Sequence, residues 1–332
     1  MYTANEHRYD KMKYLRCGKS GLKLPRISLG LWQNFGYDAS FSNVLKMCET
    51  AFDNGITYFD IANNYGNPYN GSAEENFGRV LKTSFKPYRD ELVIATKAGY
   101  DMWDGPYGCK GGSKKYLTAS LDQSLKRIGV DYVDIYYHHV FDPDTPLEET
   151  AHALDLLVHQ GKALYIGVSN YDRKQTKEIS KIFDRLGTPF IINQPMYNMI
   201  HRWIEPDGLY DLCNDSGIGI AAYCPLAQGF LTDKYLNGIK GGSRAANNEW
   251  LAGQLDDEKI AQLNALNDIA KERGQTLSQM AIAWILRDDK CSTVIIGASR
   301  PEQIDDNCKA LGNMEFSKEE IEKIDRLTKV WD

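Results

Sequence analysis

The stretch Phe59-Asp60-Ile61-Ala62-Asn63-Asn64-Tyr65-Gly66 opens a series of four in which an apolar run ends on charged or hydrogen-bonding residues. The other three are Ile94-Ala95-Thr96-Lys97-Ala98-Gly99, Ile135-Tyr136-Tyr137-His138-His139 and Tyr165-Ile166-Gly167-Val168-Ser169-Asn170. A predicted helix follows each stretch, which is typical of a barrel that carries its chemistry at one rim. We therefore expect an acid, a phenol, an ammonium and an imidazole to meet over one substrate oxygen.

Strand, loop and helix repeat about every thirty residues from Ile27 onwards, the period of a βα unit. The expected strands are 27–31, 57–61, 92–97, 132–138, 163–168, 190–194, 219–223 and 293–296. They predict an α/β fold, a single (β/α)8 TIM barrel over residues 1–332. We expect an N-terminal tail at 1–11, a β-hairpin at 12–24 and a C-terminal helix at 317–328 that begins with a Ser-x-x-Glu box.

Capping signals place several of the helices. A helix is expected from Ser113 to Arg127 with Gly129 just past it, and a second is expected to begin with Thr145 as its cap and Pro146 at its first position, ending at Gly161. Further helices are expected at 257–273 and 278–287. The segment 225–255, after the seventh strand, is longer than an ordinary connection, which indicates a functional loop.

Composition excludes several classes of protein. A net charge of -6 and a pI near 5.6 argue against nucleic-acid binding, which needs clustered Lys and Arg. No apolar run approaches eighteen residues, so neither secretion nor membrane insertion is expected. The seven cysteines are scattered without a CxxC spacing, as expected of reduced thiols in the cytoplasm.

The roles of Asp60, Tyr65 and Lys97 can be assigned only when the three residues are considered together. Alone, Asp60 could cap a loop and Tyr65 could simply pack. A lysine inside an apolar strand must find an anion, however, and Asp60 is the obvious partner. Beside Lys97, the phenolate of Tyr65 would be stabilised and its pKa would move from about 10 toward neutrality, making the hydroxyl a general acid.

His138 and His139 are adjacent, so in a strand they point to opposite faces and cannot chelate one metal together. No metal site is expected. One imidazole should face the barrel mouth, and the spacing to Asp142 and Thr145 favours His139. These roles suit hydride transfer to a carbonyl. Tyr65 protonates the alkoxide, Lys97 and Asp60 tune Tyr65 as the proton donor, and His139 holds the oxygen.

No GxGxxG motif follows a strand, so a nicotinamide cofactor must bind across the barrel loops. Ser169, Asn170 and Gln194 could bond a carboxamide, and Tyr223 could stack on a ring. Residues 297–301 open a helix N-terminus, where Ser299 and Arg300 would suit a 2'-phosphate and favour NADPH. Lys234 and Arg244, in the long loop, could hold the pyrophosphate.

These motifs resemble the aldo-keto reductases from about residue 15 to 327. The likeness also rests on Leu29-Gly30-Leu31-Trp32, Gln123-Ser124-Leu125-Lys126-Arg127, Gly161-Lys162-Ala163-Leu164-Tyr165-Ile166-Gly167-Val168-Ser169, Pro225-Leu226-Ala227-Gln228-Gly229 and Gly297-Ala298-Ser299-Arg300-Pro301-Glu302-Gln303. It is greatest to the bacterial L-glyceraldehyde 3-phosphate reductases and to potassium-channel β subunits. The resemblance implies a catalytic tetrad of Asp60, Tyr65, Lys97 and His139, with NADP(H) extended over the rim.

The resemblance also implies further contacts. Trp32 and Trp103 would wall the substrate together with Tyr65 and His139, and the cofactor would also contact Trp32, Asp60, Cys224, Pro225, Leu226, Gln228, Gly229, Gly297, Gln303, Asp306 and Asn307. The chain departs from the subgroup at His138-His139-Val140, where the subgroup has Ser-His-Arg. It keeps His139 where the β subunits have Asn.

Three functions follow as hypotheses. The first is NADPH-dependent reduction of small aldehydes and ketones, with L-glyceraldehyde 3-phosphate and methylglyoxal as candidate substrates and a homo-oligomer as the state that the subgroup implies. The alternative is a cofactor-sensing regulatory subunit of a membrane channel-like partner. A third is a Schiff-base lyase that uses Lys97, which would leave Ser169, Asn170 and Gln194 without a role.

Overall fold

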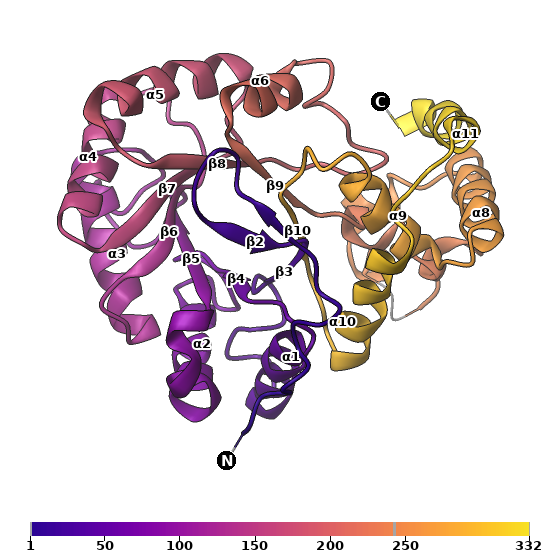
Figure 1. The fold of residues 1–332 in the computed structure, drawn as a ribbon, viewed down its shortest axis with the longest axis horizontal. Coiled ribbons are helices and arrows are strands. Elements are labelled where there is room, and N and C mark those ends of the chain that lie inside the picture. Colours follow the sequence, from indigo (N-terminus) through magenta and orange to yellow (C-terminus); the bar gives the residue numbers. More distant parts are fainter. Residues whose placement is uncertain (1, 242–243, 332) are drawn as a thin grey trace.

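A computed structural model describes residues 2–241 and 244–331; residues 1, 242–243 and 332, which fall in the expected tail, long loop and chain end, lie outside the described residues. Eight parallel strands close into a barrel in the order β10-β3-β4-β5-β6-β7-β8-β9 (Figure 1). The strands are β3 (Ile27–Gly30), β4 (Tyr58–Asp60), β5 (Val93–Ala98), β6 (Val133–His138), β7 (Ala163–Ser169), β8 (Phe190–Gln194), β9 (Gly219–Tyr223) and β10 (Thr293–Ile296). Each expected strand is found, and the predicted (β/α)8 fold is confirmed.

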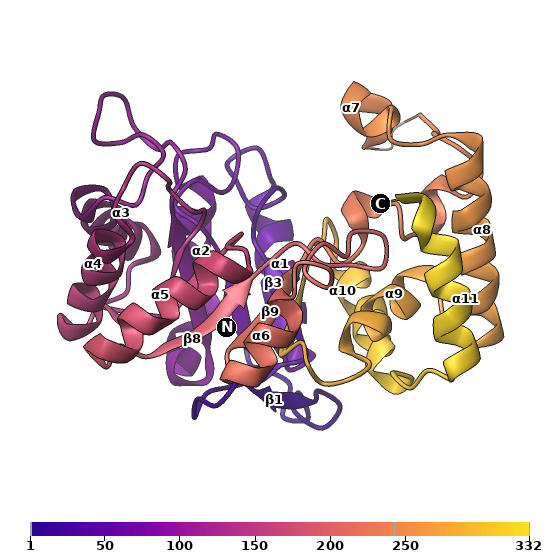
Figure 2. The same ribbon diagram turned by 90° about the horizontal axis from the view of Figure 1, so that it is seen from above.

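Helices surround the barrel and form a second layer on one side. They are α1 (Phe41–Asp53), α2 (Ser72–Val80), α3 (Lys114–Ile128), α4 (Leu147–His159), α5 (Arg173–Leu186), α6 (Leu209–Ser216), α7 (Glu249–Ala252), α8 (Asp257–Glu272), α9 (Leu277–Leu286), α10 (Pro301–Cys308) and α11 (Lys318–Thr328). Figure 2 shows α8, α9 and α11 grouped to one side of the barrel. The helices that follow β9 thus build a wall beside the rim.

Local sequence explains the helix ends. The Ser113 hydroxyl accepts from the Tyr116 N–H at the start of α3, and Gly129 ends that helix with a left-handed φ of 76°. Ser317 and Glu320 form the expected capping box of α11. The cap expected at Thr145 is wrong: α4 begins one residue later, after Pro146, and the Thr145 hydroxyl donates to Asp142 Oδ2 at 2.6 Å.

The expected hairpin, β1 (Tyr14–Arg16) with β2 (Lys23–Pro25), closes the barrel end opposite the chemistry. Cys17 and Leu24 pack with barrel-interior side chains such as Tyr137 and Ile192. A Cβ at Gly18 would lie 2.0 Å from the Gly217 carbonyl oxygen, so only glycine fits this contact. The interior is therefore a packed core, and substrate can enter only from the other rim.

The N-terminal segment lies against the helical layer. The Tyr2 hydroxyl donates to Asp53 Oδ1 at 2.7 Å, and the Tyr2 ring packs edge-on against Phe85 at 5.9 Å. Across the described ranges 2–241 and 244–331, the helices are too short or too polar to cross a bilayer.

Candidate functional site

Asp60 and Lys97 form a buried ion pair at the inner end of the rim. Asp60 ends β4, Lys97 lies near the end of the neighbouring strand β5, and Lys97 Nζ donates to Asp60 Oδ2 at 2.5 Å. The Lys97 side chain is fully buried, and its ammonium also donates to the Ile61 carbonyl at 2.7 Å. The other Asp60 oxygen accepts from Gln194 Nε2 at 2.8 Å and from the Tyr58 hydroxyl at 3.2 Å. The predicted pair is thus present, with every charge hydrogen-bonded.

Tyr65 lies in the loop after β4 with its hydroxyl 3.3 Å from Lys97 Nζ, as expected. The expected fall in its pKa is wrong. Burial, assisted by the negative charge of Asp60, raises the pKa of Tyr65 well above its usual value. Lys97 does not reverse this effect because Asp60 neutralises its charge at 2.5 Å. The phenol therefore keeps its proton at neutral pH and can deliver it to an oxygen that becomes negative.

The two histidines point apart, as the strand alternation predicted. The His139 ring lies edge-on to Tyr65 with ring centres 5.6 Å apart. Burial and the nearby Lys97 charge hold the pKa of His139 well below its usual value, so the imidazole is neutral. Its buried Nδ1 has no hydrogen-bond partner. A neutral imidazole beside the phenol can donate one hydrogen bond to a carbonyl oxygen.

His138 faces away from the mouth and holds the β5–α3 loop. Its Nε2 lies 3.4 Å from the Gly111 carbonyl oxygen and its Nδ1 lies 2.6 Å from the Tyr171 hydroxyl. Since a carbonyl can only accept, Nε2 carries the proton and Nδ1 accepts from Tyr171. Burial lowers the pKa of His138 to about 4, so this pattern persists at neutral pH.

Tyr100, which the sequence reasoning did not single out, is the aromatic residue of the β5–α3 loop that reaches the site. Its ring lies edge-on to His139 at 4.8 Å. Trp103, which is expected to wall the substrate, packs against Tyr116 with ring centres 5.3 Å apart, and its role at the substrate stays a prediction. Trp32 does lie at the site, with its ring 6.5 Å from that of Tyr65. Position in a loop did not distinguish Tyr100 from Trp103, because loop closure decides which one turns inward.

A cavity of about 870 Å³ runs from Tyr65 along the rim to the wall formed by α8, α9 and α10. Of the expected cofactor residues, those that line it are Trp32, Asp60, Gln194, Tyr223, Cys224, Pro225, Leu226, Gln228, Gly229, Lys234, Arg244, Gly297, Ser299, Arg300, Gln303, Asp306 and Asn307. Ser169 and Asn170 are absent from this lining. The Ser169 hydroxyl donates to the Gln194 carbonyl at 2.7 Å, and Asn170 bonds both the His139 carbonyl and the Tyr223 hydroxyl.

Further lining residues come from helices that follow the long loop. Asn267 and Lys271 of α8, together with Gln275 and Thr276 before α9, face the same cavity. The sequence offered no signal for them, because polar and charged residues on and just after an amphipathic helix are more often solvated. Only the packing of α8 beside the rim brings them to the cavity.

The lining fits a dinucleotide. Trp32 and Tyr223 are aromatic, and Lys234, Arg244 and Arg300 supply positive charge to the same cavity, which Asp233, Glu302 and Asp306 also line. A Cβ built at Gly297 meets no atom within 4 Å, so the wall there is open to a ligand. Ser299 at the start of α10 already donates its N–H and hydroxyl to Gln303 Oε1, at 2.8 and 3.1 Å. Lys234, Arg244 and Arg300 therefore provide charged phosphate ligands at this cavity, with Arg300 Nε 3.9 Å from Glu302 Oε2.

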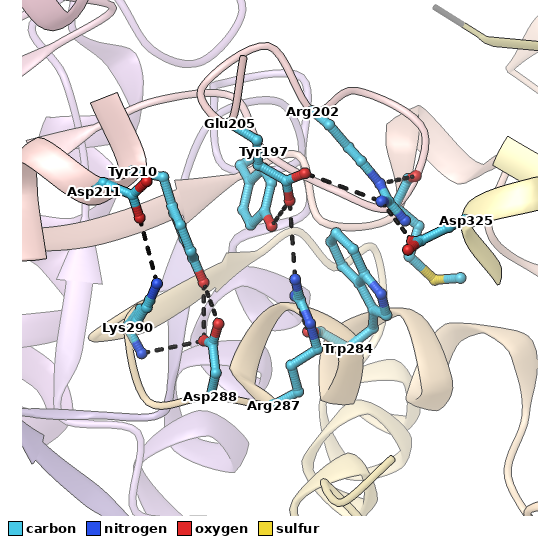
Figure 3. Close-up of polar contacts among 11 residues, drawn as sticks. Tyr197, Arg202, Glu205, Tyr210, Asp211, Trp284, Arg287, Asp288, Lys290 and Asp325 are labelled. Carbon is cyan, nitrogen blue, oxygen red and sulfur yellow. Dashed lines mark hydrogen bonds and ion pairs between the residues drawn. The ribbon is translucent and has the colours of Figure 1, made fainter. Parts of the chain in front are cut away.

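The wall is braced from behind by a cluster of aromatic and charged side chains (Figure 3). Arg202 lies over the Trp284 ring at 4.3 Å and donates to Asp325 Oδ1 at 2.7 Å. Arg287 lies over the same ring at 3.9 Å. This cluster joins the segment after β8 to α9 and α11. Arg202 therefore has a structural role in the cluster and does not lie at the rim.

Among residues 2–241 and 244–331, no group of three or more His, Cys, Asp and Glu side chains is placed to hold a metal ion. The chemistry that the described site offers is proton transfer and hydrogen bonding from Tyr65, Lys97 and His139, next to a cavity of cofactor size.

Comparison with known proteins agrees with this geometry. The family model of the aldo/keto reductase family matches residues 26–329. The L-glyceraldehyde 3-phosphate reductase of Escherichia coli (strain K12) is 51% identical, with 98% of this chain and 95% of that protein covered. A probable voltage-gated potassium channel subunit beta of Arabidopsis thaliana is 38% identical, over 90% of this chain and 91% of that protein.

Among solved structures, a thermostable aldo-keto reductase in complex with the inhibitor epalrestat superposes with a TM-score of 0.74. It is 30% identical, and the match covers 95% of this chain and all of that one. The family model, the identities and the barrel agree: this chain is an oxidoreductase that belongs to the aldo/keto reductase family.

Proposed function

We propose that the protein reduces small aldehydes and ketones with NADPH, with L-glyceraldehyde 3-phosphate and methylglyoxal as candidate substrates. The observation that carries this proposal is the Tyr65 hydroxyl, 3.3 Å from Lys97 Nζ, at the inner end of a cavity of dinucleotide size. The name of the 51% identical Escherichia coli relative supports the phosphorylated substrate.

NADPH, when bound, supplies a hydride to the carbonyl carbon. Tyr65 holds a proton on Oη and gives it to the substrate oxygen as negative charge develops there. The Lys97 ammonium then stabilises the tyrosinate, and Asp60 holds Lys97 in place through the 2.5 Å contact. His139, neutral and beside Tyr65, donates a hydrogen bond that orients the carbonyl.

We propose the following roles for the residues that line the cavity. Gln194 and Tyr223 would contact the nicotinamide end, and Lys234 and Arg244 the pyrophosphate. Arg300 would contact the 2'-phosphate that separates NADPH from NADH. Ser169 and Asn170 are proposed as supports, because their side chains position Gln194 and Tyr223 through hydrogen bonds.

A cytoplasmic location and a homo-oligomeric state are also part of the proposal. All seven cysteines are free, which fits a reducing compartment. Large aromatic side chains are exposed at Tyr37, Tyr69 and Trp250, whose exposed fractions are 55%, 59% and 65%. Such exposed apolar surface fits contact with further copies of the chain, which light scattering would detect.

A regulatory channel subunit is the second candidate, favoured by the names of the plant relatives. The imidazole of His139 beside Tyr65 favours the reductase over the regulatory subunit. The deciding experiment follows NADPH oxidation with L-glyceraldehyde 3-phosphate, methylglyoxal and an aromatic aldehyde, and then repeats the assay with NADH. Turnover supports the reductase, whereas NADPH binding by fluorescence without turnover of any substrate supports the regulatory subunit.

A further inference from the structure

The β5–α3 loop, residues 99–113, brings a free positive charge to the substrate side of the site. We propose that Lys110 is the residue that reads the substrate phosphate, and that the site therefore prefers a three-carbon aldehyde phosphate to the same aldehyde without phosphate. This inference rests on the proposed reductase function and adds to it a specificity-determining residue.

Loop closure places Lys110 near Tyr100, whose ring contacts His139. The Gly111 N–H donates to the Gly99 carbonyl at 3.2 Å, and the Lys110 N–H donates to Asp101 Oδ1 at 2.5 Å. The end of the loop thus returns to its start, next to Tyr100. Lys110 Nζ lies 6.0 Å from the centre of the Tyr100 ring, and the centre of that ring lies 4.8 Å from the centre of the His139 ring.

The two distances set an upper limit of 10.8 Å on the separation of the His139 ring centre and the Lys110 ammonium. With bonds of about 1.5 Å, the carbonyl oxygen of glyceraldehyde 3-phosphate lies about 6 Å from its phosphate oxygens. A hydrogen bond of about 2.8 Å at each end extends that reach to roughly this limit. A carbonyl held by His139 therefore places its phosphate within reach of Lys110.

The other cations near the site already have partners or different positions. Lys97 is paired with Asp60, and Arg202 with Asp325. Lys234 and Arg244 line the cofactor cavity. Lys110 is exposed, and no ion pair within residues 2–241 and 244–331 includes it. Its ammonium is thus available to a dianion.

On the same loop, the Asp101 carboxylate accepts the Lys110 N–H. The loop itself is anchored to the barrel. His138 bonds the Gly111 carbonyl, and Asp142 accepts from the Gly112 N–H at 2.8 Å. A Cβ at Gly112 would lie 2.5 Å from Thr150 Oγ1, so the loop is tightly packed there. The backbone that carries the Lys110 side chain is therefore held in place.

The test compares Lys110→Met with wild type on L-glyceraldehyde 3-phosphate and on L-glyceraldehyde, which has the same carbonyl and no phosphate. A lost charge-assisted contact predicts a rise in KM for the phosphate of about tenfold to a hundredfold. KM for L-glyceraldehyde should stay within about twofold, because its carbonyl contacts are untouched. Lys115→Met is the control, since Lys115 lies over Tyr107 at 5.0 Å instead.

An unchanged KM for the phosphate in Lys110→Met, or an equal loss on both substrates, would overturn the assignment. If wild type reduces neither aldehyde, the reductase function fails separately. Calorimetric binding of glyceraldehyde 3-phosphate to the NADP-loaded protein then decides the inference. Tighter binding to wild type than to Lys110→Met would support it, and equal or undetectable binding would refute it.

Discussion

Lys97→Met should destabilise the fold strongly. Lys97 is fully buried, Asp60 is 2% exposed, and their charged atoms lie 2.5 Å apart. Methionine fills a similar volume but leaves the Asp60 carboxylate with only the hydrogen bonds from Gln194 and Tyr58. Removing one partner of a buried ion pair costs about 3–5 kcal/mol, because the other charge stays in an apolar site. We expect a loss of this size in the free energy of unfolding.

Urea unfolding at pH 7, followed by circular dichroism, measures this loss. In the double variant Asp60→Asn with Lys97→Met neither charge of this pair remains, so it should be more stable than Lys97→Met alone by about 2 kcal/mol. Lys162→Met is the matched control: its 2.6 Å pair with Asp122 is 29% and 42% exposed, and its loss should cost at most about 1 kcal/mol. If the free energy of unfolding falls no further in Lys97→Met than in Lys162→Met, the Asp60–Lys97 pair does not have the expected effect on stability.

Three further predictions concern catalysis, pH and cofactor choice. Tyr65→Phe should lower kcat at least about a thousandfold while NADPH affinity stays within a few fold; near-normal turnover would contradict its role as proton donor. His138 has a folded pKa of about 4 and an unfolded pKa near 6.5, so only the unfolded state binds its proton between these values. Stability should therefore fall by about 3 kcal/mol from this group as pH drops from 6.5 to 4, and His138→Gln should show a shallower fall in urea titrations. Arg300→Met should raise KM for NADPH about tenfold and leave KM for NADH unchanged in steady-state assays; equal changes would remove Arg300 from the 2'-phosphate site.

The barrel and the tetrad positions could be predicted because both depend on local sequence. Each strand ends an apolar run, and parallel strands bring their carboxyl ends to one rim. Asp60, Lys97 and His139 needed only that rule and the two-residue alternation of a strand. The hairpin and the α11 capping box likewise follow from residues close together in the chain.

What the sequence could not predict depends on packing between distant segments. The pKa of Tyr65 rises because burial and Asp60 outweigh Lys97, a balance that no spacing reveals. The Tyr100 ring contacts His139 at 4.8 Å, a contact that depends on the course of the whole β5–α3 loop. Lys271 reaches the cofactor cavity only because α8 packs beside the rim.

The proposed mechanism requires that a hydride move from a nicotinamide cofactor in this cavity to the substrate carbon while Tyr65 provides the proton. Deuterium tracing follows that hydride. The protein is incubated with L-glyceraldehyde 3-phosphate and NADPH deuterated at one or the other face of C4, and the product alcohol is analysed by mass spectrometry. We predict one deuterium at the former carbonyl carbon from one face and none from the other. Product formed without deuterium from either cofactor, or turnover unchanged in Tyr65→Phe, would contradict the claim.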